Sequence, residues 1–428
     1  MMSVTTRQAL THSSKIALRQ FTTASSVATG TKLYGWGHGL SPFIKENPSE
    51  EESLPVLTPK AIDLCKLAFG AHGFSEEFLE PKLTKIASGT HHSLIAFESD
   101  VLGNRIAAVG LNTSGQLGIG STKKMLGSGL VMNIPSEGVI NSLACGREHS
   151  LVAVDFGDKS EVFSFGSSMY GQIGIGKSKH DYDDGTLVCL RTPKRVPKFL
   201  SKQDKVKQVV SGMDHTVILT EQNHLYSMGW GADGQLGLGE ESTSDHSTPS
   251  RIMKLDGESL KKISASTDFT IALNEQGKMF TWGNSEYGQC MLGSKIDRVL
   301  EPMAVSVDDQ VVDIAAGGSF ALYLTDAGKV YVTGYGGLGL GEGNIETLKP
   351  SLVEQLPVIK KIFATTHYCT AISDSGELFV WGLNSLDGRL GTGNTEHLFV
   401  PKKIEFPKNV CVEDVSLGVS HAFAICQE

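Results

Sequence analysis

The sequence lacks the signals that would assign it directly to a familiar class of enzyme or membrane protein. None of the seven cysteines stands in a C-x-x-C pair, and no apolar run approaches 18 residues. We therefore expect free thiols in a reducing compartment, no disulfide framework and no transmembrane segment, which leaves peripheral membrane association open. No metal-ligand cluster or Ser-His-Asp set stands out either. We predict no metal, no cofactor and no bond-breaking catalytic residue.

Acidic residues are missing from the N-terminal segment. No Asp or Glu precedes Glu46, although the 428 residues contain 47 of them. Arg7, Lys15 and Arg19 lie there among many Ser and Thr, and "KIALRQF" sets apolar residues beside basic ones. Such a segment is typical of a mitochondrial transit peptide, with a disordered tail as the alternative. We predict a transit peptide over residues 1–29 and a protein of the mitochondrial matrix or of the matrix face of the inner membrane.

Basic charge is also in deficit over the whole chain. The net charge is −9, with 38 Lys and Arg against 47 Asp and Glu. We do not expect a broad basic surface from such a sequence, although a local basic patch stays open, so we expect no DNA partner, and direct RNA binding is disfavoured. An acidic surface fits a basic protein partner instead.

What the chain has in excess is glycine, with 48 residues, and two glycine-rich stretches imitate nucleotide-binding motifs. "GQIGIGKS" (171–178) matches the phosphate loop G-x-x-x-x-G-K-S, and "GWGADG" (229–234) matches G-x-G-x-x-G. However, "GQLGIG" from Gly115 and "GQLGLG" from Gly234 are further copies of the first element. A phosphate loop also needs a helix directly after it, and "KHDYDDGTLVCLRTPKRVP" has no helical period. We therefore interpret both stretches as repeat elements.

The repeats extend over nearly the whole chain. Segments such as "SGMDHTVILTEQNHLYSMGWGADGQLGLG" recur, and their marker positions fall at intervals of 48 to 66 residues. The markers are His92, His149, His215, Phe269, Phe320, Tyr368 and His421. The seventh unit is split, because "LGVSHAFAICQE" ends the chain and "KLYGWGHG" from Lys32 supplies its missing half.

The sequence of each repeat unit predicts an antiparallel meander of about four short strands. Alternating apolar segments are separated by turn sequences such as "NEQGK" and "TDAGK". One meander cannot bury both its faces, whereas seven stacked radially can. We predict an all-β, seven-bladed β-propeller over residues 30–428, closed between N- and C-terminal strands. Three tryptophans at one repeat position, Trp36, Trp282 and Trp381, are expected to pack between blades, and the marker histidines are expected to be structural.

Two insertions interrupt the regular spacing, at about 39–85 and 177–197. The first contains "TPKAIDLCKLAFG", which predicts a helix with Thr58 as N-cap, Pro59 at its first position and Gly70 after its end. The second carries "HDYDDG" (His180 to Gly185), for which a protruding hairpin and a plain surface loop are both open.

The repeat pattern resembles the regulator of chromosome condensation family. The pattern is S-G-x-x-H-[ST], then a strand, then W-G-x-x-x-x-G-Q-L-G, and it covers about 32–428. "GWGADGQLGLG", "WGNSEYGQ" and "GELFVWG" are most similar to the mitochondrial, exchange-factor-like branch. The resemblance implies guanine-nucleotide exchange on a mitochondrial GTPase, or regulation of it, in a branch linked to mitochondrial fusion. It also leaves open a non-catalytic scaffold for mitochondrial ribosome assembly, with assembly factors as partners.

In that family, acids beside the repeat histidine line the partner face, and a hairpin wedges against the GTPase. The matching positions here are Glu148, Asp214 and Asp268, with Phe269 replacing the histidine after the last of them. The hairpin would correspond to the second insertion, with Asp181, Asp183 and Asp184. We predict these six residues as partner-binding, with ordinary solvated loop acids as the alternative.

Overall fold

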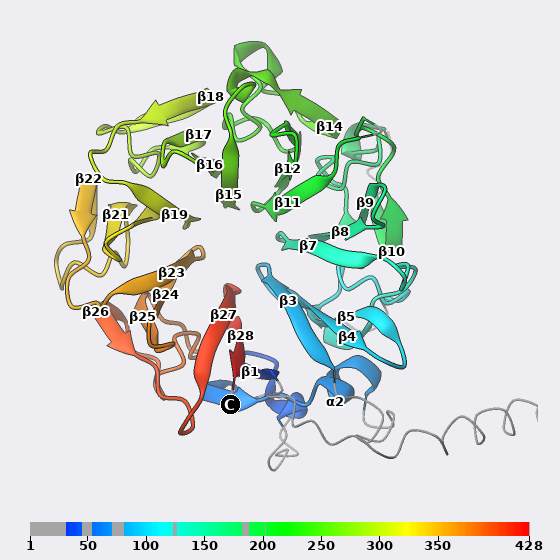
Figure 1. Cartoon of the computed structure of the whole chain (residues 1–428), viewed down its shortest axis with the longest axis horizontal. Helices are drawn as coiled ribbons and strands as arrows, with labels where there is room; N and C mark the ends of the chain where they lie inside the picture. Colours follow the sequence, from blue (N-terminus) through cyan, green and yellow to red (C-terminus); the bar gives the residue numbers. More distant parts are fainter. Residues whose placement is uncertain are drawn as a thin grey trace, which may run out of the picture. The chain divides into compact units, whose positions relative to one another are not determined.

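The strands of this chain form a closed ring of seven blades. The computed structural model describes residues 31–44, 54–70, 81–122, 126–181, 188–201 and 203–427, and among them 28 strands form seven four-stranded antiparallel sheets. Figure 1 shows the first strand of each blade (β3, β7, β11, β15, β19, β23 and β27) around the centre of the ring. The predicted seven-bladed β-propeller is confirmed.

Six blades use consecutive strands. Blade 1 comprises β3 (Lys82–Ser88), β4 (His92–Ser99), β5 (Gly103–Leu111) and β6 (Leu126–Leu130). Blade 2 comprises β7 (Val139–Cys145), β8 (His149–Asp155), β9 (Ser160–Ser167) and β10 (Cys189–Arg195). Blade 3 comprises β11 (Val206–Ser211), β12 (His215–Thr220), β13 (Leu225–Gly229) and β14 (His246–Ile252). Blade 4 comprises β15 (Leu260–Ser266), β16 (Phe269–Asn274), β17 (Met279–Ser285) and β18 (Ile296–Val305); blade 5 comprises β19 (Val311–Ala316), β20 (Phe320–Thr325), β21 (Val330–Tyr335) and β22 (Glu346–Leu352); blade 6 comprises β23 (Ile359–Ala364), β24 (Tyr368–Ser373), β25 (Leu378–Gly382) and β26 (Leu398–Lys403).

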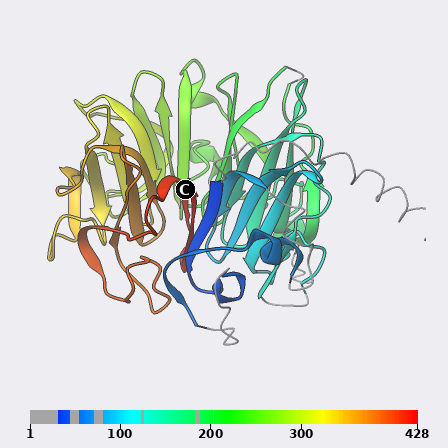
Figure 2. The same cartoon turned by 60° about the horizontal axis from the view of Figure 1, so that its bottom comes forward.

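Blade 7 joins the two ends of the chain. Its strand order is β2 (Val56–Ala61), β1 (Thr31–Gly37), β28 (His421–Gln427) and β27 (Cys411–Leu417), with β1 and β28 paired in antiparallel register from Thr31↔Gln427 to Gly37↔His421. In Figure 2 the blue β1 runs beside the red C-terminal strands. This strand pairing closes the ring, as the split repeat predicts. It joins the N-terminal strands β2 and β1 to the C-terminal strands β28 and β27 in one sheet.

The predicted helix of the first insertion starts later than the sequence suggests. Thr58 and Pro59 lie in β2, and the helix α2 spans Leu64–Phe69. Asp63 is the N-cap, with its side chain accepting a hydrogen bond from the Lys66 amide, and Gly70 ends the helix with φ 76. Proline is tolerated in β2 because this outermost strand pairs on one side only. Short 3-10 helices span Ser41–Phe43, Lys179–Asp181, Glu240–Ser242 and Met253–Leu255.

Tryptophan and glycine form one kind of contact between blades. A Cβ on Gly237 of blade 3 would lie 2.8 Å from the Trp282 ring of blade 4, and the Trp282 Nε1 donates to the Gln235 carbonyl at 2.9 Å. Gly391 and Trp36 repeat this packing between blades 6 and 7, and Gly339 and Trp381 repeat it between blades 5 and 6. These glycines let an indole ring lie flat against the neighbouring loop, so the three tryptophans do pack between blades.

The marker residues form a second contact, which we call the belt. The Ser150 hydroxyl of blade 2 donates to the Gln116 carbonyl of blade 1 at 2.8 Å, and the His92 Nε2 of blade 1 lies 2.8 Å from the same oxygen. Because the hydroxyl has only one proton to donate, His92 donates from Nε2. The same pairing joins His149 to Thr216 at 3.2 Å, His215 to Thr270 at 3.1 Å and His421 to Ser93 at 2.6 Å.

The belt changes character around the ring. Where blade 4 carries Phe269, blade 5 carries Ala321, which has no hydroxyl, and the two residues share one apolar cluster. At the next junction these positions are occupied by Phe320 of blade 5 and Cys369 of blade 6. At the junction after that they are occupied by Tyr368 of blade 6 and Ala422 of blade 7. At the second position of a belt pair, a hydroxyl therefore occurs only where the preceding blade supplies a histidine, so each belt hydroxyl has a hydrogen-bond partner.

Burial keeps the belt histidines neutral. It lowers the pKa of His92, His149, His215 and His421 from 6.5 to about 3. These residues are therefore uncharged in the folded protein at neutral pH, as a structural role requires.

Acid should destabilise the ring through this belt. The histidines bind protons with a pKa of 6.5 in the unfolded chain but only with a pKa of about 3 in the folded chain. Their contribution to the free energy of unfolding is therefore fully present above pH 6.5 and is lost as the pH falls towards 3. Each histidine should contribute up to about 1.4 kcal/mol per pH unit inside this window. We expect the double replacement His92→Phe and Ser150→Ala to reduce the slope by one proton. Urea unfolding between pH 4.5 and 7 measures the slope.

The matched control is Phe269→Leu, because Phe269 occupies the belt position of blade 4 and carries no titratable group. It should leave the slope unchanged. A double variant with the wild-type slope would show that His92 is not a source of the acid sensitivity.

Candidate functional site

The loops that join the first and second strands of each blade lie on one face of the ring, which we call the loop face. The residue before the belt position is held in the same way in every blade, because its carbonyl accepts the amide of a residue at the end of the third strand or directly after it. For example, the Trp230 amide donates to the Asp214 carbonyl at 2.9 Å, and the Asn284 amide donates to the Asp268 carbonyl at 2.8 Å. The face is therefore a set of fixed positions whose side chains can vary.

Backbone hydrogen bonds also connect these loops from blade to blade. The Arg147 amide of blade 2 donates to the Met213 carbonyl of blade 3 at 3.0 Å, and the Met213 amide donates to the Thr267 carbonyl of blade 4 at 2.9 Å. Side chains carried by these loops are consequently held in fixed relative positions, as a binding site requires.

Acidic residues occupy this position in three consecutive blades only. In ring order from blade 1, the seven residues are His91, Glu148, Asp214, Asp268, Ser319, His367 and Ser420. We call Glu148, Asp214 and Asp268 the acidic arc. The structure brings these three predicted residues together, because Glu148 and Asp268 both lie close enough to Asp214 for their charges to interact.

Two members of the acidic arc have partners within the face. Arg147 donates a hydrogen bond to the Asp214 carboxylate, whose side chain is only 13% exposed, and Ser114 donates to Glu148 at 3.1 Å. Burial nevertheless raises the pKa of Asp214, with Arg147 opposing the rise and Glu148 and Asp245 adding to it. One arginine thus faces several carboxylates.

Asp268 is the least compensated of the three. Burial, followed by the charges of Asp233 and Asp214, raises the pKa of Asp268 from 3.8 to about 6, against the smaller effect of Arg147. Among the described residues, no ion pair involves its carboxylate. The arc therefore carries negative charge that a cation from outside the chain would stabilise.

Asp181, the one described residue among the other predicted site residues, has a local role in its own turn. The exposed Asp181 lies in the 3-10 helix Lys179–Asp181, where its carboxylate accepts the Ser178 amide at 2.6 Å and so caps a local turn. Asp183 and Asp184 lie outside the described residues, so both remain predictions, as does a hairpin in this insertion.

The stretch 171–178 is a turn that packs against the next blade. A Cβ on Gly174 would lie 2.4 Å from the Met228 Sδ of blade 3, and one on Gly171 would lie 2.3 Å from the Ser247 Cα. The segment that follows contains the three-residue 3-10 helix Lys179–Asp181, too short to direct a set of amides and a dipole at a phosphate. The glycines of this motif are explained by contact between blades.

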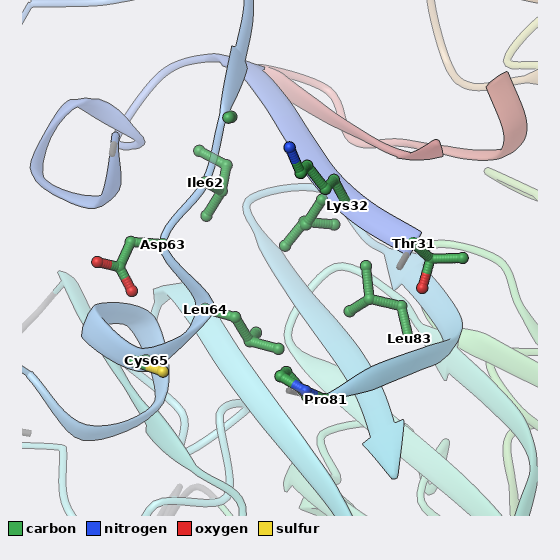
Figure 3. Close-up of a pocket in the computed structure, with 10 residues that line it drawn as sticks. Thr31, Lys32, Ile62, Asp63, Leu64, Cys65, Pro81 and Leu83 are labelled. Carbon is green, nitrogen blue, oxygen red and sulfur yellow. The ribbon is translucent and has the colours of Figure 1, made fainter. Parts of the chain in front are cut away.

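A small cavity lies at the seam between blades 7 and 1 (Figure 3). Its volume is about 200 Å³, and Leu33, Ile62, Leu64 and Leu83 supply apolar lining. Asp63 lies at the edge of this cavity, and its side chain is already hydrogen-bonded as the N-cap of α2. The cavity offers no set of polar groups that converge on one point.

A larger cleft of about 910 Å³ opens between the same two blades on the loop face. At its rim the His38 Nδ1 lies 3.1 Å from the Asp387 carboxylate, and the His91 Nδ1 lies 3.2 Å from the Ser420 hydroxyl. Serine and aspartate thus contact different histidines, so these groups do not form a Ser-His-Asp relay. The two pairs connect blades 6, 7 and 1 where the ring closes.

Comparison with known proteins agrees with this architecture. A sequence model of the RCC1-like domain matches residues 183–428. Over 373 residues, 82% of this chain and 77% of the relative, the chain is 31% identical to the mouse RCC1-like G exchanging factor-like protein. This chain belongs to the RCC1-like family. The family resemblance inferred from the repeats is therefore confirmed.

Two further RCC1-like relatives extend the comparison. The Arabidopsis thaliana protein named RCC1 domain-containing protein RUG3, mitochondrial, is 29% identical over 421 residues, 92% of this chain and 88% of that one. The crystal structure of human WBSCR16 is 27% identical and matches 93% of this chain and 99% of that one with a TM-score of 0.78. All seven cysteines of the present RCC1-like chain are free thiols, and its described residues contain no helix long and apolar enough to cross a membrane.

Several residues of this face were missed by the sequence reasoning. Arg147 directly precedes Glu148, so its proximity to the arc could have been inferred from the repeat alignment. Asp233 and Asp245 both belong to the long loop between the third and fourth strands of blade 3, and only the folded ring brings them to Asp268 and Asp214. The spacing of the repeats gave no signal for that approach.

The interpretation of 171–178 predicts that Lys177→Ala binds nucleotide no differently from the wild-type protein. Neither protein should bind ATP or GTP measurably, since the glycines serve contact between blades and the 3-10 helix Lys179–Asp181 is too short to bind a phosphate. Equilibrium dialysis with labelled nucleotides is the measurement. Nucleotide binding that is lost in Lys177→Ala would establish a phosphate loop and overturn the interpretation.

Asp268→Asn should stabilise the protein at pH 8. The pKa of Asp268 is about 6 in the folded protein and 3.8 in the unfolded chain, so protonation of this carboxyl group favours the folded state. Its contribution to stability is fully present below pH 4 and is lost as the pH rises through 6. A neutral amide removes the cost, so we expect a gain of about 1–2 kcal/mol at pH 8 and little change at pH 4. Melting temperatures at the two pH values test this expectation.

Asp326→Asn provides the control, because Asp326 is an exposed acid in a turn between second and third strands, on the opposite face. It should change neither melting temperature. Destabilisation of Asp268→Asn at pH 8 would contradict the assignment of an uncompensated charge.

Proposed function

We propose that this chain is a mitochondrial guanine-nucleotide exchange factor, or regulator, of a mitochondrial GTPase, and that the acidic arc is its contact with the GTPase. The observation that carries the proposal is the concentration of three carboxylates, with one arginine among them, on three adjacent loops that are connected by backbone hydrogen bonds. The name of the mouse relative, RCC1-like G exchanging factor-like protein, supports the same activity.

Exchange requires no bond-breaking group, which suits a face built from carboxylates and backbone loops. A GTPase holds its nucleotide largely through a lysine and Mg²⁺ at the phosphates. A carboxylate that offers this lysine another partner weakens nucleotide binding and stabilises the empty GTPase. Asp268, which lacks an ion-pair partner among the described residues, and Asp214, which shares Arg147 with its neighbours, are suited to this role.

The replacement of histidine in blades 4 to 6 does not count against exchange. The belt histidines are buried between blades, and the acids precede them on the surface loops. Asp268 keeps its place in the arc although Phe269 follows it. Loss of the repeat histidine therefore changes a junction between blades and leaves the acidic position available.

Mitochondrial location, in the matrix or on the matrix face of the inner membrane, is part of the proposal. It is supported by the acid-free N-terminal sequence and by the name of the Arabidopsis relative. The acidic arc would equally fit basic ribosomal proteins, so a scaffold for mitochondrial ribosome assembly is the second candidate.

The exchange proposal can be tested with a GTPase captured by the protein itself. The purified full-length chain is immobilised, incubated with EDTA-treated mitochondrial extract, and the retained GTPase is identified and loaded with fluorescent GDP. Wild-type protein should accelerate GDP release, and Asp214→Asn with Asp268→Asn should slow the accelerated release at least tenfold. That factor corresponds to about 1.4 kcal/mol of transition-state stabilisation.

Asp326→Asn on the opposite face serves as the matched control and should retain full activity. If wild-type protein retains ribosomal proteins and leaves GDP release unaccelerated, the scaffold is correct and the exchange proposal is wrong.

A further inference from the structure

A cation already occupies an aromatic cage beside the acidic arc. The Lys179 Nζ lies 4.2 Å from the ring centroid of Tyr170 and 5.4 Å from that of Trp230. The two rings contact each other edge to face with centroids 4.7 Å apart. Ammonium groups at such distances are attracted to the negative faces of aromatic rings.

Carboxylates complete this cage. The Asp245 carboxylate lies 3.8 Å from the Lys179 Nζ, and the Asp245 side chain is only 10% exposed. The Trp230 Nε1 donates to the Asp233 carboxylate at 3.2 Å, which fixes the orientation of the indole ring. Two aromatic rings and a nearly buried carboxylate thus converge on one ammonium group.

The lysine in the cage can leave without unfolding its loop. Backbone bonds hold this segment independently of the side chain, since the Lys179 amide donates to the Met169 carbonyl at 3.0 Å and the Ser168 hydroxyl donates to the Lys177 carbonyl at 2.6 Å. The Lys179 side chain is 34% exposed and has four rotatable carbon segments. Its exchange with another cation requires only a change of rotamer.

The cage and the acidic arc form one continuous surface. Trp230 donates its amide to the Asp214 carbonyl, and Tyr170 lies close enough to Arg147 to influence the pKa of the guanidinium group. A partner bound to the arc would therefore reach the cage at the junction of blades 2 and 3.

We propose that this cage receives a lysine or arginine side chain from a basic segment of the partner protein, and that Lys179 is an internal competitor which the partner displaces. The inference rests on the proposed function in one respect, the use of the loop face by a protein partner. The negative charge of Asp214, Asp233 and Asp245 around the cage favours a basic peptide over a phosphate-bearing partner.

The test uses a synthetic peptide of alternating glycine and lysine, with blocked termini, titrated into the full-length protein in a calorimeter at low salt. Lys179→Ala should bind this peptide about tenfold more tightly than the wild-type protein. If Lys179 fills the cage about nine-tenths of the time, only about one-tenth of the wild-type molecules have an open cage, and the apparent affinity for the peptide falls by the same factor. Lys179→Arg should bind like wild type, since the arginine also fills the cage. Adding Trp230→Leu to Lys179→Ala should abolish the gain.

Lys177→Ala is the matched control, because it removes one positive charge from the same exposed loop without emptying the cage. It should bind the peptide like wild type. Equal tightening by Lys177→Ala and Lys179→Ala, or a gain that survives Trp230→Leu, would reduce the effect to general charge attraction and overturn the proposal. The peptide measurement does not involve a GTPase, so a failed exchange assay and a failed cage are separate results.

Discussion

The contact between adjacent blades is the interaction on which the rest of this structure depends. A four-stranded meander buries its two faces only if a neighbour lies on each side, and a ring of seven meets this condition at every position. Each junction combines a belt pair with a loop from the preceding blade. At the junction of blades 3 and 4, for example, His215 pairs with Thr270 while Trp282 packs on Gly237. Glycine is required here because a side chain would occupy the space of the indole ring.

The same junctions make the loop face rigid enough to act as a binding site. Each loop is bonded to the third strand of its own blade, and the loops of blades 2 to 4 are bonded to one another through Met213 and Thr267. The ring can therefore hold carboxylates close together that would otherwise move apart. Burial, with the charges of Asp233 and Asp214 adding to it, raises the pKa of Asp268, so the ionised carboxylate costs free energy, which is expected of a surface shaped for a partner.

Repetition explains how much could be predicted from the sequence. Because the signal recurs seven times, the blade count, the split blade and the structural role of His92 and Trp282 could be inferred from the amino-acid sequence alone. The predicted start of α2 was wrong, since a Thr-Pro pair that looks like a helix start lies in the outermost strand β2. Positions within one repeat were predictable, whereas contacts between long loops of different blades were not. Asp233 of blade 3 is 35 residues from Asp268 of blade 4 in the chain, and no periodic pattern marks their approach.

The acidic arc and the cage occupy the part of the ring where the belt is polar. Glu148, Asp214 and Asp268 lie on blades 2 to 4, and His92, His149 and His215 make the belt bonds that lead from blade 1 to blade 4. Such bonds are directional, so they fix the angle between neighbouring blades more narrowly than the Phe269–Ala321 packing does. A surface that must align several carboxylates with one partner needs that control most. The belt thus supplies the precision in the same blades whose loops carry the charge, whereas the belt pairs between blades 4 and 5 and between blades 5 and 6 are apolar.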